Sequence, residues 1–170
     1  YSRLAQRYQN ISTLYLKTNS LKDAIHYTLK ALDFHKKKFE DRAPRKWDFV
    51  EGNLIPLSKD SKELFYTKSG RERGAVVGYG ECILNYAKCL SMQKKYNEAI
   101  ELIDKASNYF YIFPKIYNLS QLEKGINLVY NKSTEGPKLI KDSLRNLEKL
   151  DKKFSKTQIA LIEGAKKLIK

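Results

Sequence analysis

Residues 8–32 read YQNISTLYLKTNSLKDAIHYTLKAL and contain two runs of helical spacing on either side of a short polar break. In the first run, Tyr8, Ile11 and Tyr15 recur every three or four residues, which places them on one face of a helix. The break ends at Ser20, a residue type that favours the N-cap of a helix. This pattern predicts two antiparallel helices joined by a very short turn.

The same pattern returns 75 residues later in the chain. Aligning the two copies matches the large apolar residues Tyr8 and Tyr15 with Ile83 and Leu90. Small residues also match, in three pairs: Ser12 with Ala87, Ala24 with Ala99, and Ala31 with Ala106. Small side chains let two helices approach closely, and neither hairpin can bury its apolar face alone. We therefore expect a repeat whose neighbouring units cover one another.

Three short motifs carry a resemblance to a known family. They are Leu-Lys-Asp-Ala-Ile at 21–25, Lys-Ala-Leu at 30–32 and Tyr-Asn-Glu-Ala-Ile at 96–100. These hairpins resemble tetratricopeptide (TPR) repeats, and the match covers about 70 of the 170 residues. The resemblance implies an all-α fold of antiparallel helical hairpins stacked as a right-handed superhelix. It also implies that the first helices of successive hairpins line a concave groove.

The whole chain reads as one TPR-like domain in five segments. They are a hairpin at 1–40, an insertion at 41–72, a hairpin at 73–112, a degenerate hairpin at 113–152 and a C-terminal helix at 153–170. The third hairpin lacks the small-residue pattern, although Pro137 suits the first turn of its second helix. Ser155 suits the N-cap of the last helix, which we expect to cap the array; half of a further repeat is the alternative.

The insertion interrupts the repeat with helix-breaking residues, including Pro44, Pro56 and Gly70. Two short runs of β-prone residues, 46–51 and 62–67, indicate a β-hairpin-like excursion. The segment is rich in large apolar residues, so we expect it to be ordered. It either packs on the outer face of the array or forms a flap over the groove.

The sequence contains no recognisable set of catalytic residues, so we expect a non-catalytic chain that binds neither cofactor nor metal. The glycines between 70 and 80 resemble phosphate-binding loops only superficially, because no strand leads into them. We expect them to relax the junction between insertion and helix. His26 and His35 are expected to be exposed. The two cysteines lie seven residues apart on one helix, about 10 Å by helical rise, which is too far for a disulfide. Both are expected to be small buried side chains.

Composition favours a soluble, helical and basic chain. Of 170 residues, 33 are Lys or Arg and 19 are Asp or Glu, giving a formal charge of +14. A hydrophobic fraction of 42% is enough for a core, and no run approaches the roughly 18 apolar residues of a membrane span. The sequence opens without Met inside a helical pattern and shows no signal peptide. We therefore expect a cytoplasmic fragment of a larger bacterial scaffold, sensor or regulatory protein.

Positive charge is concentrated in the C-terminal third, where residues 113–170 hold 13 basic and 6 acidic side chains. Such a surface attracts acidic protein or nucleic acid. However, basic and acidic residues alternate, and no nucleic-acid-binding motif is present. Nucleic-acid binding through the lysine-rich C-terminal helices is therefore the less favoured interpretation.

The resemblance implies a groove lined by three sets of residues. The first hairpin would present Gln6, Gln9, Asn10, Thr13 and Lys17; the second Glu81, Asn85, Lys88 and Met92; and the third Tyr117, Gln121, Lys124 and Asn127. Side-chain amides donate and accept, so they can hold the backbone of an extended peptide. The lysines would attract acidic side chains or a C-terminal carboxylate.

The function expected from these features is a scaffold that binds a protein or peptide segment in the groove. The alternative is the sensor module of a bacterial signalling protein or transcriptional regulator, similar to peptide-pheromone receptors. The salt dependence of binding distinguishes both the scaffold and the sensor module from RNA binding, because the affinity for nucleic acid falls steeply as the salt concentration rises.

Overall fold

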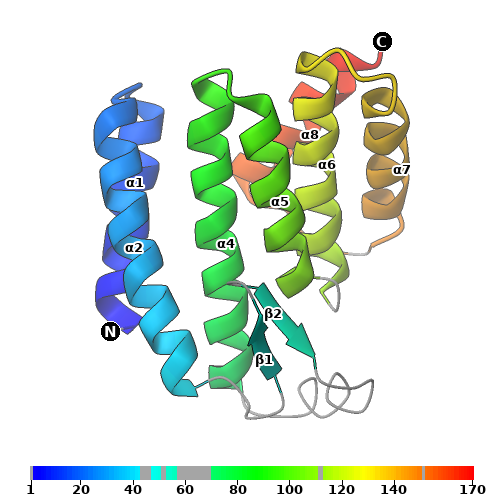
Figure 1. Ribbon diagram of the computed structural model, residues 1–170. Coiled ribbons are helices and arrows are strands. Elements are labelled where there is room, and N and C mark those ends of the chain that lie inside the picture. Colours follow the sequence, from blue (N-terminus) through cyan, green and yellow to red (C-terminus); the bar gives the residue numbers. More distant parts are fainter. Residues whose placement is uncertain (1, 43–46, 51–52, 57–69, 111–112, 151) are drawn as a thin grey trace.

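The computed structural model describes residues 2–42, 47–50, 53–56, 70–110, 113–150 and 152–170 (Figure 1). This part of the chain is all-helical apart from one small β-hairpin. The helices are α1 (Ser2–Lys17), α2 (Leu21–Arg42), α4 (Gly70–Met92), α5 (Tyr96–Phe110), α6 (Pro114–Tyr130), α7 (Gly136–Glu148) and α8 (Lys156–Leu168). The strands are β1 (Trp47–Val50) and β2 (Asn53–Pro56). None of the described helices is both long and apolar enough to cross a membrane.

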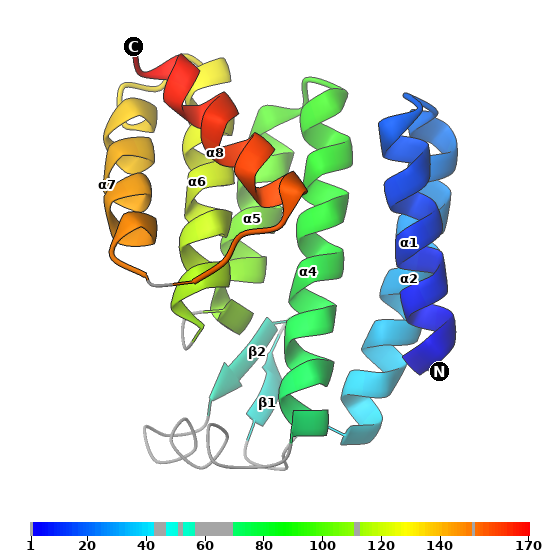
Figure 2. The ribbon, with the colours of Figure 1, turned by 180° about the vertical axis from the view of Figure 1, so that it is seen from behind.

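The first six of these helices form three antiparallel hairpins, α1/α2, α4/α5 and α6/α7, which lie side by side in chain order (Figure 1). Seen from behind, α1, α4 and α6 face the viewer, and α8 crosses in front of α6 toward α4 (Figure 2). The first helices of the hairpins therefore share one face of the molecule.

The three hairpins turn in the same way. Asn19, Lys94 and Lys132 adopt left-handed backbone conformations, with φ of 57°, 62° and 60°. The next residue in each turn donates its N–H to the carbonyl five residues back: Ser20 to Tyr15 at 3.0 Å, Lys95 to Leu90 at 2.9 Å, and Ser133 to Leu128 at 2.9 Å. This is the hydrogen bond of a Schellman helix ending. The same turn thus recurs at intervals of 75 and 38 residues.

Small residues lie where the helices approach one another, as the alignment predicts. The side chains of Ala24, Ala31, Ala87, Ala99 and Ala106 are fully buried, and Ser12 is 1% exposed. The hydroxyl of Ser12 does not remain unsatisfied, because it donates to the Ala24 carbonyl at 3.0 Å.

The third hairpin has its own close contact, built from glycine. A Cβ placed on Gly125 would lie 2.8 Å from Ile140 Cγ1, and one on Gly136 would lie 2.7 Å from the Val129 backbone nitrogen. The alanine pattern of the first two hairpins is not repeated here, but two glycines bring the helices of this hairpin together. Glycine substitutes for alanine where α6 and α7 touch.

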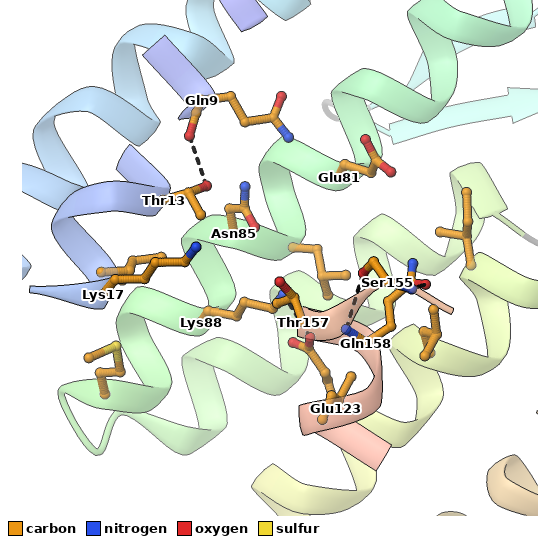
Figure 3. A pocket seen from close by; sticks show the side chains of 16 residues that line it. Gln9, Thr13, Lys17, Glu81, Asn85, Lys88, Glu123, Ser155, Thr157 and Gln158 are labelled. Carbon is orange, nitrogen blue, oxygen red and sulfur yellow. Dashed lines mark hydrogen bonds and ion pairs between the residues drawn. The ribbon is translucent and has the colours of Figure 1, made fainter. Parts of the chain in front are cut away.

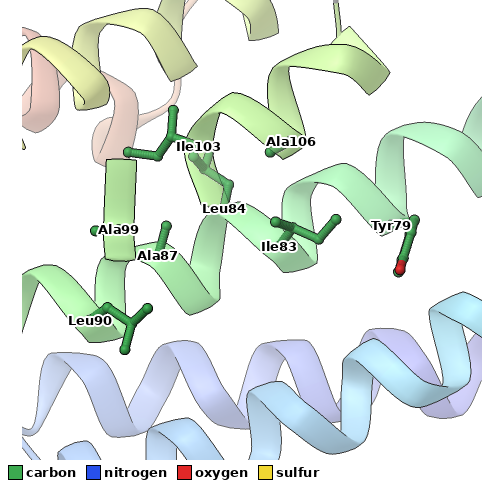
Figure 4. Packing of buried hydrophobic residues seen from close by; sticks show 8 residues of the cluster. All are labelled: Tyr79, Ile83, Leu84, Ala87, Leu90, Ala99, Ile103 and Ala106. Carbon is green, nitrogen blue, oxygen red and sulfur yellow. The ribbon is translucent and has the colours of Figure 1, made fainter. Parts of the chain in front are cut away.

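The core consists of two clusters. The first lies between α4 and α5, with Ala87, Ile103 and Ala106 fully buried, and α2 contributes Leu32 from the side (Figure 4). The second joins α6, α7 and α8 around Leu122 and Ile140. Each cluster draws on more than one hairpin or helix, so neighbouring units bury one another.

The glycine-rich segment is helical rather than a relaxed junction, because α4 already begins at Gly70. Its Gly78 lies against His35 of α2, where a Cβ would come within 2.9 Å of the imidazole Cε1. The expectation that His35 is exposed is wrong: it is 3% exposed, and its Nε2 lies 3.1 Å from Gln9 Oε1. The missing side chain of Gly78 makes room for the ring.

The cysteines agree with their prediction. Cys82 and Cys89 are free thiols and fully buried. Burial, followed by the proximity of Cys89 and Glu81, raises the pKa of the Cys82 thiol to about 12. The thiol of Cys82 therefore stays protonated at neutral pH.

The insertion is shorter than expected, since α2 continues to Arg42 and α4 starts at Gly70. Its described part is an antiparallel pair in which Trp47 lies opposite Pro56 and Val50 opposite Asn53. Strand β1 agrees with the first β-prone run, whereas β2 lies outside both predicted runs. Strand β2 packs against α5. The second run falls in 57–69, outside the described residues, so the flap stays a prediction.

Helix α8 begins as predicted, with Ser155 as its N-cap. Ser155 Oγ accepts from the Gln158 N–H at 3.3 Å, and Gln158 Oε1 accepts from the Ser155 N–H at 2.9 Å. We expected this helix to cap the array, and it packs on α6 and α7 of the last hairpin. It crosses α6 toward α4, and Ala165 is fully buried in the second core cluster (Figure 2).

Candidate functional site

A cavity of about 610 Å³ lies where α1, α4, α6 and the start of α8 meet (Figure 3). The first two helices supply most of its polar lining. The residues from α1 are Gln9, Thr13, Leu16 and Lys17, and those from α4 are Glu81, Leu84, Asn85, Lys88 and Met92. The first and second hairpins thus present the face expected from the sequence.

Two of the residues predicted for the first hairpin do not reach the cavity. Gln6 and Asn10 are exposed, and the Gln6 amide donates to Asn10 Oδ1 at 3.1 Å. Of the residues predicted for this helix, Gln9, Thr13 and Lys17 line the cavity. Asn10 is the equivalent of Asn85 in the 75-residue repeat, but of the two only Asn85 lines the cavity.

The third hairpin presents different residues from those predicted. Gln121 donates to Ser107 Oγ at 2.9 Å, Lys124 pairs with Asp104 at 2.7 Å, and Tyr117 packs on the first core cluster. All three side chains therefore contact the preceding hairpin rather than the cavity.

An error of two residues in the alignment explains the difference. The residues expected from the third hairpin, Tyr117, Gln121 and Lys124, lie 36 residues after Glu81, Asn85 and Lys88 of the second. The repeated turn instead places Lys132 38 residues after Lys94. With this interval Glu123 corresponds to Asn85, and Glu123 lines the cavity with Ile116 and Leu119. Asn127 is buried behind them and donates to the Glu123 carbonyl at 2.9 Å.

An ion pair that the sequence did not indicate joins two of these helices. Lys88 Nζ lies 3.0 Å from Glu123 Oε1, with the lysine side chain 37% exposed and the glutamate side chain 6% exposed. The Glu123 carboxylate raises the pKa of Lys88. Burial raises the pKa of Glu123, and the nearby ammonium of Lys88 only partly offsets this. Both effects follow from placing a charge pair at the wall of the cavity.

Glu81 adds a second carboxyl group to the same wall. Burial raises the pKa of Glu81, while the positive charge of Lys88 acts in the opposite direction. Two lysines and two glutamates therefore line the cavity, and their formal charges balance. A site of this kind does not select strongly for net charge.

The start of α8 forms a further part of the cavity wall. Ser155, Thr157, Gln158 and Leu161 all line it, and the capping box holds the Gln158 amide in place. The sequence identified this helix and its cap but not its docking place. No signal in the local pattern shows which face an amphipathic helix covers.

The lining combines apolar side chains with amide and charged groups. Leucines from all four helices contribute the apolar part: Leu16, Leu84, Leu119 and Leu161. The amides of Gln9, Asn85 and Gln158 can donate to carbonyls and accept from N–H groups. Among the described residues no group of three or more His, Cys, Asp or Glu is arranged to hold a metal ion. The arrangement suits a small ligand with both apolar and amide groups.

Comparison with protein-family models, curated proteins and solved structures finds no match to this chain. The functional argument therefore depends on the geometry of the chain itself.

Proposed function

We propose that this chain is a non-catalytic TPR-like module that binds a short peptide segment in the cavity between α1, α4, α6 and α8. The observation that carries the proposal is the cavity itself, which joins the first helices of three hairpins with Asn85 at its wall. As part of a larger protein, such a module would recognise a partner through an exposed loop or chain end.

The repeated architecture supports the TPR-like part of the proposal. The same left-handed turn ends the first helix of each hairpin, at Asn19, Lys94 and Lys132. Buried small residues recur at Ala24 and Ala99. Both features are those of a repeat whose units stack on one another.

The size of the cavity supports a short ligand. Sites for small molecules have volumes of about 300–1,000 Å³, and this cavity of about 610 Å³ falls in that range. Since α8 covers part of the same face, the site holds a few residues of an extended peptide rather than a long segment. The balanced charges imply recognition mainly by amides and apolar contact, with exposed Lys17 adding attraction for an acidic group.

One observation favours the sensor alternative as a second candidate. Among the residues of α8, Ala165 is the one fully buried, although the first turn of α8 lines the cavity. A ligand in the cavity would touch both the hairpins and α8. Binding would then bias the position of α8, which is what a sensor module requires.

A peptide selection tests the proposal. The chain is immobilised and used to select from a phage-displayed library of random peptides, and the affinity of each enriched peptide is measured by calorimetry. We expect Asn85→Ala to weaken binding about tenfold, which corresponds to about 1–1.5 kcal/mol for a lost hydrogen bond. The folded state of each variant is checked by circular dichroism.

Asn146→Ala is the matched control, because Asn146 is exposed and bonds Asn118 at 3.1 Å outside the cavity. The affinity of this variant for the enriched peptides should equal that of the unmodified chain. The proposal fails if no peptide is enriched, or if Asn85→Ala binds the enriched peptides unchanged. Affinity that collapses as salt rises would indicate charge-driven binding instead.

A further inference from the structure

Four aromatic rings form a continuous ladder on the first hairpin. Tyr15 stacks on Tyr27 with centroids 5.4 Å apart, Tyr27 on Tyr8 at 6.1 Å, and Tyr8 on Phe34 at 5.6 Å. The ring planes differ by 24° or less. We call these four residues the aromatic ladder; they alternate between α1 and α2.

The corresponding face of the second hairpin is covered by a helix. Tyr8 and Tyr15 align with Ile83 and Leu90, which are only 7% and 5% exposed. Leu32 of the preceding helix α2 packs against the cluster that contains them. A helix of the neighbouring unit therefore buries this face.

The third hairpin repeats the arrangement. Helix α5 covers α6 through polar contacts along its length: Asp104 with Lys124 at 2.7 Å, Ser107 with Ser120 at 3.1 Å, and Asn97 with Asn131 at 2.7 Å. Two of the three hairpins thus have a helix laid along the same side of their first helix.

On the first hairpin this side is more open. Tyr8 and Tyr15 are only partly buried, and Leu4 beside them in the helix is 43% exposed. Among the described elements, α1 packs mainly on α2 and only slightly on α4. Figures 1 and 2 place the α1/α2 hairpin at the end of the row.

The charge around the ladder is positive. Lys30 Nζ lies 5.7 Å from the centroids of both Tyr8 and Tyr27. Lys37 Nζ lies 5.8 Å from that of Phe34, but it also pairs with Asp33 at 2.9 Å. Residues 1–40 hold 8 basic and 3 acidic side chains. A second copy of this chain, with a charge of +14, would therefore meet electrostatic repulsion.

We propose that the aromatic ladder is a docking surface for an acidic amphipathic helix of a partner protein. The repeat geometry supplies the shape of the occupant, because α2 and α5 occupy the corresponding faces of the other hairpins. Lys30 at the rings and the basic excess of residues 1–40 indicate that its charge is negative. A helix that lays its apolar face in a groove is a common mode of recognition.

The chain contains a suitable probe in its own α5. This 15-residue sequence already covers such a face, and it carries Glu98, Glu101 and Asp104 against Lys105. A synthetic α5 peptide is stapled on its solvent side, because short helices are marginal in water. The control peptide is residues 21–38 of α2, stapled in the same way, which has five lysines and two aspartates. Binding to the full chain is followed by NMR and calorimetry.

We expect the α5 peptide to bind and to shift the signals of Tyr8, Tyr15 and Tyr27, with the α2 peptide at least tenfold weaker. Lys30→Glu should weaken α5 binding about tenfold. Leu29→Ala, which alters an exposed leucine (44%) outside the ladder, should not change it. Asn85→Ala should also leave it unchanged, so this surface and the cavity can fail independently.

Three results would overturn the proposal. They are no binding of the α5 peptide at about 1 mM, a weak limit for specific recognition; equal binding of the two peptides; and shifts at Lys17 and Asn85 instead of the ladder. The NMR spectrum of Lys30→Glu must show a folded protein, so that its loss of binding results from the changed surface and not from unfolding.

Discussion

The ion pair between Lys88 and Glu123 is the residue-scale feature with the clearest energetic consequence. Glu123 is almost fully buried, whereas Lys88 is 37% exposed at the cavity. Removing Lys88 and removing Glu123 should not lower the free energy of unfolding by the same amount. A carboxylate left without its partner stays buried, but an ammonium on a long side chain can reach water.

We therefore predict that Lys88→Met lowers the free energy of unfolding at pH 7 by about 1–3 kcal/mol, less than for a wholly buried pair. Glu123→Leu should cost less, and the double variant should lie close to the unmodified chain. Urea unfolding of all four proteins measures the cycle. The prediction is wrong if the two single variants lose the same free energy of unfolding and the double variant loses the sum. The two side chains would then not be energetically coupled.

The pH dependence follows from the direction of each shift. The folded-state pKa of Lys88 is raised, so its stabilising contribution is present at neutral pH and is lost as the pH rises above about 10.4. The pKa of Glu123 is raised by burial. The free energy of unfolding of Lys88→Met should therefore rise as the pH falls from 7 toward 5, because the unpartnered Glu123 carboxyl takes up a proton. Unfolding by urea across this range measures the slope, and a slope no different from that of the unmodified chain would contradict the assignment.

At the scale of elements, the contact between α2 and α4 depends on a missing side chain. A Cβ on Gly78 would lie 2.9 Å from the buried imidazole of His35, so the ring or the helix must move. We predict that Gly78→Ala destabilises the fold by about 1–3 kcal/mol, despite the better helix propensity of alanine. Thermal and urea unfolding measure the change.

Gly164 provides the matched control for this substitution. It is also a helical glycine, but a Cβ there meets no atom within 4 Å. Gly164→Ala should therefore stabilise the chain by about 0.5–1 kcal/mol through reduced backbone entropy. Stabilisation by both substitutions would show that α2 and α4 are not as closely packed at Gly78 as described.

The elements themselves could largely be predicted from the sequence. The periodic apolar residues located the helices, and Ser155 identified the start of α8, because both signals act within a few residues. The register of the third hairpin could not be predicted in the same way. It depends on the turn at Lys132 and on glycine contacts at Gly125 and Gly136, which the small-residue pattern of the first two hairpins does not predict.

At the scale of the whole molecule, the parts that could not be predicted depend on contacts between distant segments. The burial of His35 requires Gly78 from another hairpin, and the pairing of Glu123 requires Lys88. The return of α8 over α6 likewise depends on the second core cluster. For the candidate site, Lys17, Asn85 and Lys88 were therefore found from the sequence, while Glu123 and Gln158 were not.

The position of α8 also limits what the molecule can bind. Its first turn occupies one side of the face formed by α1, α4 and α6, and leaves a cavity of about 610 Å³. A long peptide running along the whole face would have to displace it. We therefore expect a short ligand that touches Asn85 and Gln158 together.

NMR of the side-chain amides tests this central claim most directly, using a peptide selected on the chain. The account predicts that the amide signals of Asn85 and Gln158 shift on titration, while those of Asn97 and Asn146, which are exposed on α5 and α7, do not. A peptide that shifts Asn97 or Asn146 and leaves Asn85 and Gln158 unchanged would contradict it.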